Sequence, residues 1–168
     1  MGDFQVIEQK LSEFKKKFYF SALLRGGILF LAIGALYFLL TAWIEELLWL
    51  SKPLRALMFW VFILVEVGLW FYWIWPALSV LIGIKAPMSD KEAAQIIGTQ
   101  IPEVGDRLTN TLDLLKQAQD TELVLASIAQ KSKTLSPFYF NQAIDLKDNI
   151  KHLRWIILPV SVLILIWA

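Results

Sequence analysis

The sequence contains no cysteine and a single histidine, His152. Without cysteine the chain forms neither disulfides nor thiolate metal sites, and one histidine cannot build a histidine cluster. The phosphate-binding motif G-x-x-x-x-G-K-[ST], the nucleophile motif G-x-S-x-G and the zinc motif H-E-x-x-H are also missing. We therefore expect no enzyme: the sequence identifies no catalytic residues, no cofactor, no metal site and no small-molecule substrate.

Charge is scarce as well. Charged residues make up 18% of the 168 residues and hydrophobic residues 57%, against roughly a quarter and a half in globular proteins. The net charge of +1 and the lack of a basic stripe argue against a nucleic-acid partner. Because the apolar excess is gathered in blocks, the composition predicts an all-α integral membrane protein.

Three apolar blocks are candidate membrane spans. Residues 26–44 carry no charge, and residues 56–84 are interrupted only by Glu66, with Pro76 as the expected kink. The third block, residues 155–168, reaches about 21 Å as a helix, whereas the hydrocarbon core is roughly 30 Å thick. We therefore expect a truncated third span, with the protein continuing beyond it. A retained anchor is favoured over a cleaved signal peptide for the first block.

Basic residues near the ends of the spans predict the orientation, because lysine and arginine concentrate on the cytoplasmic side. Lysines and Arg25 precede the first span, whereas the loop after it holds Lys52 and Arg55 beside Glu45 and Glu46. The amino terminus is thus predicted to be cytoplasmic, in a multi-pass membrane protein. The residues expected at the membrane surface are Lys15, Lys16, Lys17 and Arg25.

The segment before the first span has an apolar helical face, formed by Phe4, Ile7, Leu11, Phe14 and Phe18. Their spacing of three and four residues is typical of an amphipathic helix. Two interpretations stay open. The helix lies in the headgroup layer with its lysines against anionic lipid, or its apolar face is a short self-association seam.

The tryptophans have a membrane pattern. Trp43 and Trp49 flank the outer end of the first span, and Trp155 marks the inner start of the third. An interfacial aromatic belt explains this placement, with a ligand-binding aromatic cage as the alternative.

Residues 85–154 are predicted to form a cytoplasmic insert of short helices. Ser89 and Glu92 fit a capping box that starts the first helix, and Pro102 starts the second after a break near Ile101. The apolar line through both helices consists of Ile97, Ile101, Val104, Leu108, Leu112 and Leu115.

Two more helices are expected in the insert. The third begins near Asp120 or Thr121 and carries Leu135 on its apolar face. The fourth opens at Ser136 and Pro137 and continues into the third span.

Glu66 is the one charged residue deep in a predicted span. An ionised side chain there costs at least about 2.5 kcal/mol, so it must be protonated, paired or hydrogen-bonded. Tyr37 on the first span reaches a comparable depth, which makes a Glu66–Tyr37 hydrogen bond one solution. A proton or ion relay, and pairing with another part of the protein or another subunit, are the alternatives.

The order of these features resembles the amino-terminal part of large bacterial inner-membrane proteins grouped as a domain of unknown function, number 4175. The resemblance rests on the lysine-rich lead, the paired spans and three phrases: EAAQIIGTQIPEVGDRLTNTLDLL, ELVLASIAQKS and FNQAIDLKDNIKHLRW. It implies a longer protein with a large coiled-coil-rich helical region beyond the third span. Some members are labelled ATPase, a name that no motif here supports.

Together these observations predict a lead helix over residues 1–25, a transmembrane hairpin over 26–84, an insert over 85–154 and a third span from 155. The expected function is a scaffolding anchor that tethers an extracytoplasmic helical region to the inner membrane. Membrane lipid and a protein partner or a second copy are the expected partners. The alternative is a subunit of an ion-driven motor or transporter that uses Glu66.

Overall fold

The computed structural model describes residues 2–117, 122–135 and 137–167, and most of these residues are helical, with no strand among them. The chain divides into two compact units. Unit 1 combines Met1–Phe18 with Ala86–Asp145, and unit 2 combines Tyr19–Lys85 with Leu146–Ala168. Each unit is therefore assembled from segments that are distant in the sequence.

Helix α1, Gly2–Leu48, contributes to both units. The sequence predicted a separate lead segment over residues 1–25, but the structure assigns the lead up to Phe18 to unit 1 and the rest of α1 to unit 2. The helix ends with Trp49 in the left-handed region, at φ 47°, where its amide donates to the carbonyl of Glu45. This ending closes the helix before the loop to α2.

The second apolar block is divided into three helical pieces. Helix α2, Lys52–Leu69, follows Ser51 with proline in its first turn. A π-helical turn, η1 (Trp70–Ile74), then leads into α3, Trp75–Leu81, where the amide of Trp75 donates to the carbonyl of Trp70. The interruption lies immediately before Pro76, which has no amide hydrogen to continue the α-helical ladder. The sequence located this break correctly.

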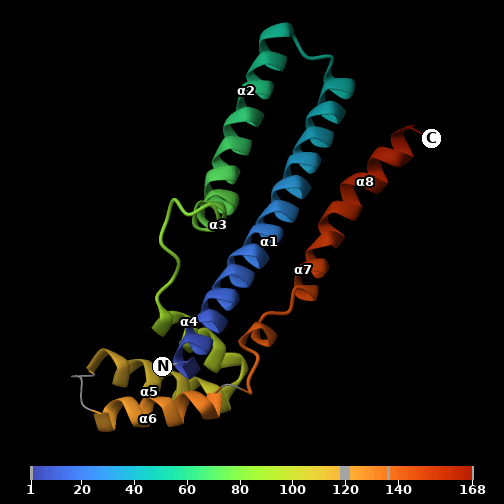
Figure 1. Ribbon diagram of the computed structural model, residues 1–168. Coiled ribbons are helices and arrows are strands. Elements are labelled where there is room, and N and C mark those ends of the chain that lie inside the picture. The colour runs from blue at the N-terminus through green and yellow to red at the C-terminus, as the bar shows by residue number, and fades with distance from the viewer. Residues whose placement is uncertain (1, 118–121, 136, 168) are drawn as a thin grey trace. The chain divides into compact units, whose positions relative to one another are not determined.

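Besides the first part of α1, unit 1 contains the helices α4 (Asp90–Gln100), α5 (Pro102–Gln117) and α6 (Glu122–Leu135). Helix α5 contacts both neighbours (Figure 1). The capping box is confirmed: the amide of Glu92 donates to Ser89 Oγ at 3.2 Å, and the amide of Ser89 donates to Glu92 Oε2 at 2.8 Å. The break at Ile101 and the start at Pro102 are also confirmed.

Glycines allow α4 and α5 to cross closely. A Cβ built on Gly98 would lie 2.8 Å from the Cα of Gly105, and one on Gly105 would lie 2.5 Å from the Cα of Gly98. Both distances are shorter than a real Cβ contact, so the crossing requires glycine at these positions.

The lead part of α1 contributes to the core of unit 1. Ile7, Leu11 and Phe14 are at most 1% exposed and pack in one cluster with residues of the insert. Those residues are Ala93, Ala94, Ile97, Val104, Leu108, Leu112, Leu135 and Phe140. The interpretation of this apolar face as a lipid-contacting surface is therefore wrong, because protein side chains cover it. Phe4 and Leu115, also expected on these apolar faces, lie outside the residues whose side chains the structure describes.

The predicted fourth helix starts later than expected: the chain is helical from Lys147 through Trp167, as the predicted continuation into the third span requires, but not directly after Pro137. Its proposed first residue, Ser136, and the expected start of the third helix at Asp120 or Thr121 lie outside the described residues. After Pro137 the chain forms only a 3₁₀ turn, η2 (Phe140–Ala143), followed by Ile144 in extended conformation.

Lysines of α1 explain this departure from helix. Lys10 Nζ donates to the carbonyl of Phe138 at 3.0 Å, and Lys17 Nζ donates to that of Asn141 at 2.6 Å. These bonds and the burial of Phe140 hold residues 138–141 as a loop on unit 1.

Three short pieces complete unit 2: α7 (Lys147–Ile150), η3 (Lys151–Leu153) and α8 (Arg154–Trp167). Asn149 Nδ2 donates to Ser21 Oγ at 2.8 Å and to the carbonyl of Ser21 at 3.2 Å, which attaches α7 to α1. Pro159 lies inside α8.

Candidate functional site

Within unit 2, α1 packs against α2 and η1 through a series of pairs (Figure 1). Phe30 meets Trp70 edge to face, with ring centroids 6.1 Å apart, and Tyr37 stacks on Phe62 at 5.2 Å. Below them, a Cβ on Gly26 would lie 2.7 Å from the carbonyl oxygen of Trp73. The α2 and η1 residue numbers fall as the α1 numbers rise, as antiparallel helices require.

Glu66 lies over Gly34 in this series. A Cβ at position 34 would be 2.6 Å from Glu66 Oε1, so the carboxylate occupies the space that a side chain would fill. Oε1 is buried, and no hydrogen-bond partner for it exists among the described residues. The glycine thus creates room for a polar group without supplying a hydrogen-bond donor.

The predicted bond between Glu66 and Tyr37 does not form. The Tyr37 hydroxyl instead donates to the backbone carbonyl of Met58, over a long 3.4 Å. The error is about one helical turn, because residues opposite each other across the pair are Tyr37 with Phe62 and Gly34 with Glu66. Sequence reasoning missed Gly26 and Gly34, although their spacing of eight residues places both on one helical face.

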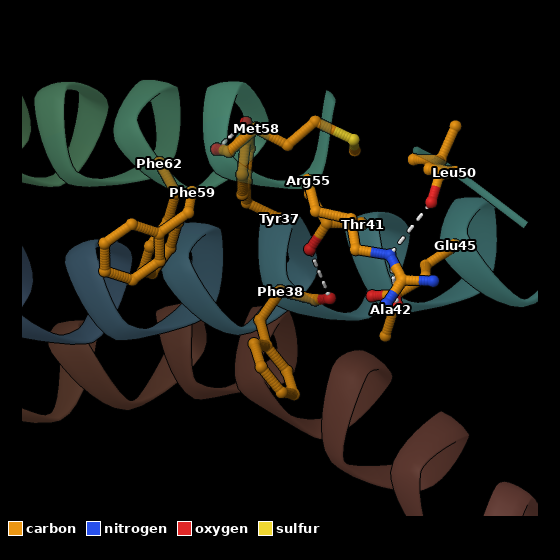
Figure 2. Close-up of a pocket in the computed structure, with 10 residues that line it drawn as sticks. All are labelled: Tyr37, Phe38, Thr41, Ala42, Glu45, Leu50, Arg55, Met58, Phe59 and Phe62. Atoms are coloured by element: carbon orange, nitrogen blue, oxygen red, sulfur yellow. Dashed lines mark hydrogen bonds and ion pairs between the residues drawn. The ribbon is translucent and has the colours of Figure 1, made fainter. Parts of the chain in front are cut away.

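A cavity of about 350 Å³ lies between α1 and α2 near their connecting loop. Figure 2 shows aromatic side chains at one end and a charged pair at the other. Its lining residues are Tyr37, Phe38, Thr41, Ala42, Glu45, Leu50, Arg55, Met58, Phe59 and Phe62. The volume falls in the range of small-molecule sites, roughly 300–1,000 Å³.

At the charged end of the cavity, Arg55 Nε lies within hydrogen-bond distance of both a carboxylate and a backbone carbonyl. Arg55 Nε lies 3.0 Å from Glu45 Oε1 and donates to the carbonyl of Leu50 at 3.0 Å (Figure 2). About half of each charged side chain is exposed, 52% for Arg55 and 47% for Glu45. The half-exposed guanidinium group therefore remains accessible beside the Glu45 carboxylate.

Four basic residues were expected at a membrane surface, and two of them instead form polar contacts with other residues of unit 1. Lys15 Nζ lies 2.7 Å from Asp90 Oδ1 with its side chain 14% exposed, and Lys17 binds the carbonyl of Asn141. Lys16 and Arg25 are exposed. The packing of α1 into the unit 1 core explains the difference, because it brings these lysines against the insert.

Unit 1 offers no assembled chemical site. No group of three His, Asp or Glu residues that would hold a metal ion occurs in the described part of the chain. The Glu92 carboxylate accepts from the Ser89 amide and then from its hydroxyl, which lowers the pKa of Glu92 below its ordinary value of 4.5. Lys15 contributes in the same direction. These contacts belong to the helix cap.

Comparisons with known proteins gave no match: no family model, no curated protein and no solved structure resembles the chain at a significant level. Its function must therefore be inferred from its own side chains.

Proposed function

We propose that this chain is a structural anchor of the bacterial inner membrane that tethers a large helical region on the outer side. The supporting observation concerns two helices, Gln5–Leu48 and Lys52–Leu81. Their most apolar windows have mean hydropathies of 2.2 and 2.0, yet only 11% and 6% of those windows are buried. A core helix of a soluble protein would be mostly covered, so these side chains need an apolar surrounding from outside the chain.

Large apolar side chains on both helices are exposed. On α2, Leu64 is 74% exposed and Trp60 66%, and on α1 Leu31 is 61% exposed. Hydrocarbon removes such side chains from water without a protein partner, and helices satisfy their own backbone hydrogen bonds there. A transmembrane hairpin of α1 and α2 is the arrangement that accounts for them.

The proposed orientation places the amino terminus and unit 1 in the cytoplasm. It follows from the lysines and arginine before the first apolar block and the few basic residues in the loop after it. The outer helical region is part of the proposal because of the resemblance described above. Unit 1 then offers its exposed surface to a protein partner or a second copy.

Single cysteines test this topology directly, because the sequence has none of its own. Ser51→Cys lies in the loop between α1 and α2, and Gln130→Cys lies on the exposed side of α6. In intact spheroplasts a membrane-impermeant maleimide should label the first and spare the second, and permeabilisation should expose both. Labelling of Gln130→Cys in intact cells, or extraction of the protein by carbonate, would contradict the proposal.

A second candidate function is proton or ion transfer in a membrane motor or transporter. The observation that favours it is the Glu66 carboxylate, whose Oε1 is buried against Gly34 without a hydrogen bond. Carboxylates within membrane helices commonly mark ion or proton pathways.

A Glu66→Gln variant separates the two functions. If the chain is an anchor, the glutamine at position 66 should preserve assembly and any activity of the complete complex. For a relay, assembly should persist while ion-dependent activity is abolished, and the native mass should correspond to a ring-like oligomer. A monomer or dimer with unchanged activity would exclude the relay.

A further inference from the structure

We propose that the cavity between α1 and α2 binds one phospholipid with a zwitterionic, primary-ammonium headgroup, of the phosphatidylethanolamine class. The inference rests on the proposed transmembrane placement of these two helices. It goes further by assigning a specific ligand to a cavity within one compact unit.

The polarity of the cavity changes along its length. Phe59, Phe62 and Met58 provide an apolar wall, whereas Arg55 and Glu45 stand at the end near the loop (Figure 2). In the proposed topology the loop lies outside, so this gradient runs in the same direction as the bilayer, from hydrocarbon to headgroup. An acyl chain fits the aromatic end and a headgroup fits the charged end.

The two charged residues at the loop end of the cavity, which we call its mouth, determine which headgroup fits. Arg55 and Glu45 carry opposite charges 3.0 Å apart, which complements a molecule that also carries both signs. The half-exposed Arg55 guanidinium group suits a lipid phosphate, because arginine binds phosphate through several parallel N–H donors. The Glu45 carboxylate suits an ammonium that donates hydrogen bonds. A choline headgroup has no N–H donor, and a glycerol headgroup has no positive charge.

The two hydroxyl groups that line the cavity, those of Thr41 and Tyr37, already donate hydrogen bonds within the protein. The Thr41 hydroxyl donates to the carbonyl of Phe38 at 2.8 Å, and the Tyr37 hydroxyl donates to that of Met58. Since both donors are used within the helices, the ligand segment between headgroup and aromatic wall meets a largely apolar surface. A hydrocarbon chain requires such a surface.

The test reconstitutes the full chain in vesicles with equal amounts of phosphatidylethanolamine, phosphatidylcholine and phosphatidylglycerol. After mild detergent extraction, native mass spectrometry should show one retained lipid, with the ethanolamine lipid enriched over the other two. Arg55→Gln should reduce retention roughly tenfold, as expected for loss of a charge-assisted hydrogen bond. Glu45→Gln should shift the preference toward phosphatidylglycerol, because it leaves a net positive mouth.

Two matched variants test the cavity itself. Ala42→Phe places a ring in the lining and should abolish retention, whereas Leu40→Phe introduces the same ring on α1 outside the lining and should not. Equal lipid retention by these two variants would overturn the proposal. So would an unaltered protein that carries no lipid, as a monomer or a dimer, or a headgroup preference that Glu45→Gln does not change. Flotation with the vesicles is measured for every variant. A protein that floats without retained lipid refutes only this inference, whereas one that fails to float refutes the membrane anchor as well.

Discussion

At the residue scale, neighbouring glycines on α1 have opposite structural roles. Gly26 faces the backbone of Trp73 across the helix pair, whereas a Cβ on Gly27 would meet nothing within 4 Å. Gly34 is intermediate, because the atom it faces is the end of the flexible Glu66 side chain. Close approach of two backbones thus depends on one glycine of the adjacent pair.

Alanine at these positions should therefore have different effects. We expect Gly26→Ala to destabilise the helix pair by about 1–3 kcal/mol, because backbone atoms must move apart. Gly27→Ala should be neutral or stabilise by up to about 1 kcal/mol, since alanine favours helix. Thermal unfolding in detergent measures both. Similar midpoints for the two variants would contradict the close packing described at Gly26.

The Glu92 carboxylate gives unit 1 a specific pH dependence. Its pKa is lowered in the folded chain, so the charged carboxylate stabilises the fold fully above its ordinary value of 4.5. That contribution is lost as the pH falls through the lower folded pKa. Glu92→Gln should flatten the loss of stability on acidification, and Glu103→Gln, an exposed position on α5, should leave it unchanged. Identical acid titrations of all three proteins would reject this assignment.

At the element scale, the lead part of α1 belongs to the unit 1 core. Phe14 is fully buried there, while Ser12 on the same helix is exposed. Phe14→Ala should destabilise unit 1 by about 3–5 kcal/mol, the usual cost of truncating a buried phenylalanine. Proteolysis rates of the insert measure this, with Ser12→Ala as the control. If the variant instead weakens only vesicle binding, the helix contacts lipid rather than protein.

Helix boundaries were predictable where their causes are local. The start of α4 depends on Ser89 and Glu92, three residues apart, and the start of α5 depends on Pro102 itself. Residues 138–141 were not predictable in this way. Their conformation depends on Lys10 and Lys17, more than 120 positions away in the sequence, and a local pattern contains no information about such bonds.

At the scale of the whole molecule, each unit is built from separated segments. Three core residues of unit 1 come from the first eighteen residues and the rest from the insert. Deleting residues 2–18 should therefore make residues 86–145 sensitive to proteases. A chain carrying Ser12→Ala and Lys16→Ala, two exposed positions in the same segment, should remain resistant. Equal resistance of the deleted chain would show that the insert folds alone.

The sequence by itself determined the helical class, the two long apolar helices, the capping box and the break before Pro76. Hydropathy, periodicity and proline chemistry act over a few neighbouring residues, so they can be inferred without coordinates. Only the tertiary structure decided what Glu66 faces, what covers Phe14 and how Arg55 and Glu45 meet beside an aromatic cavity. These depend on the register between helices, and a shift of one turn changes every opposing pair.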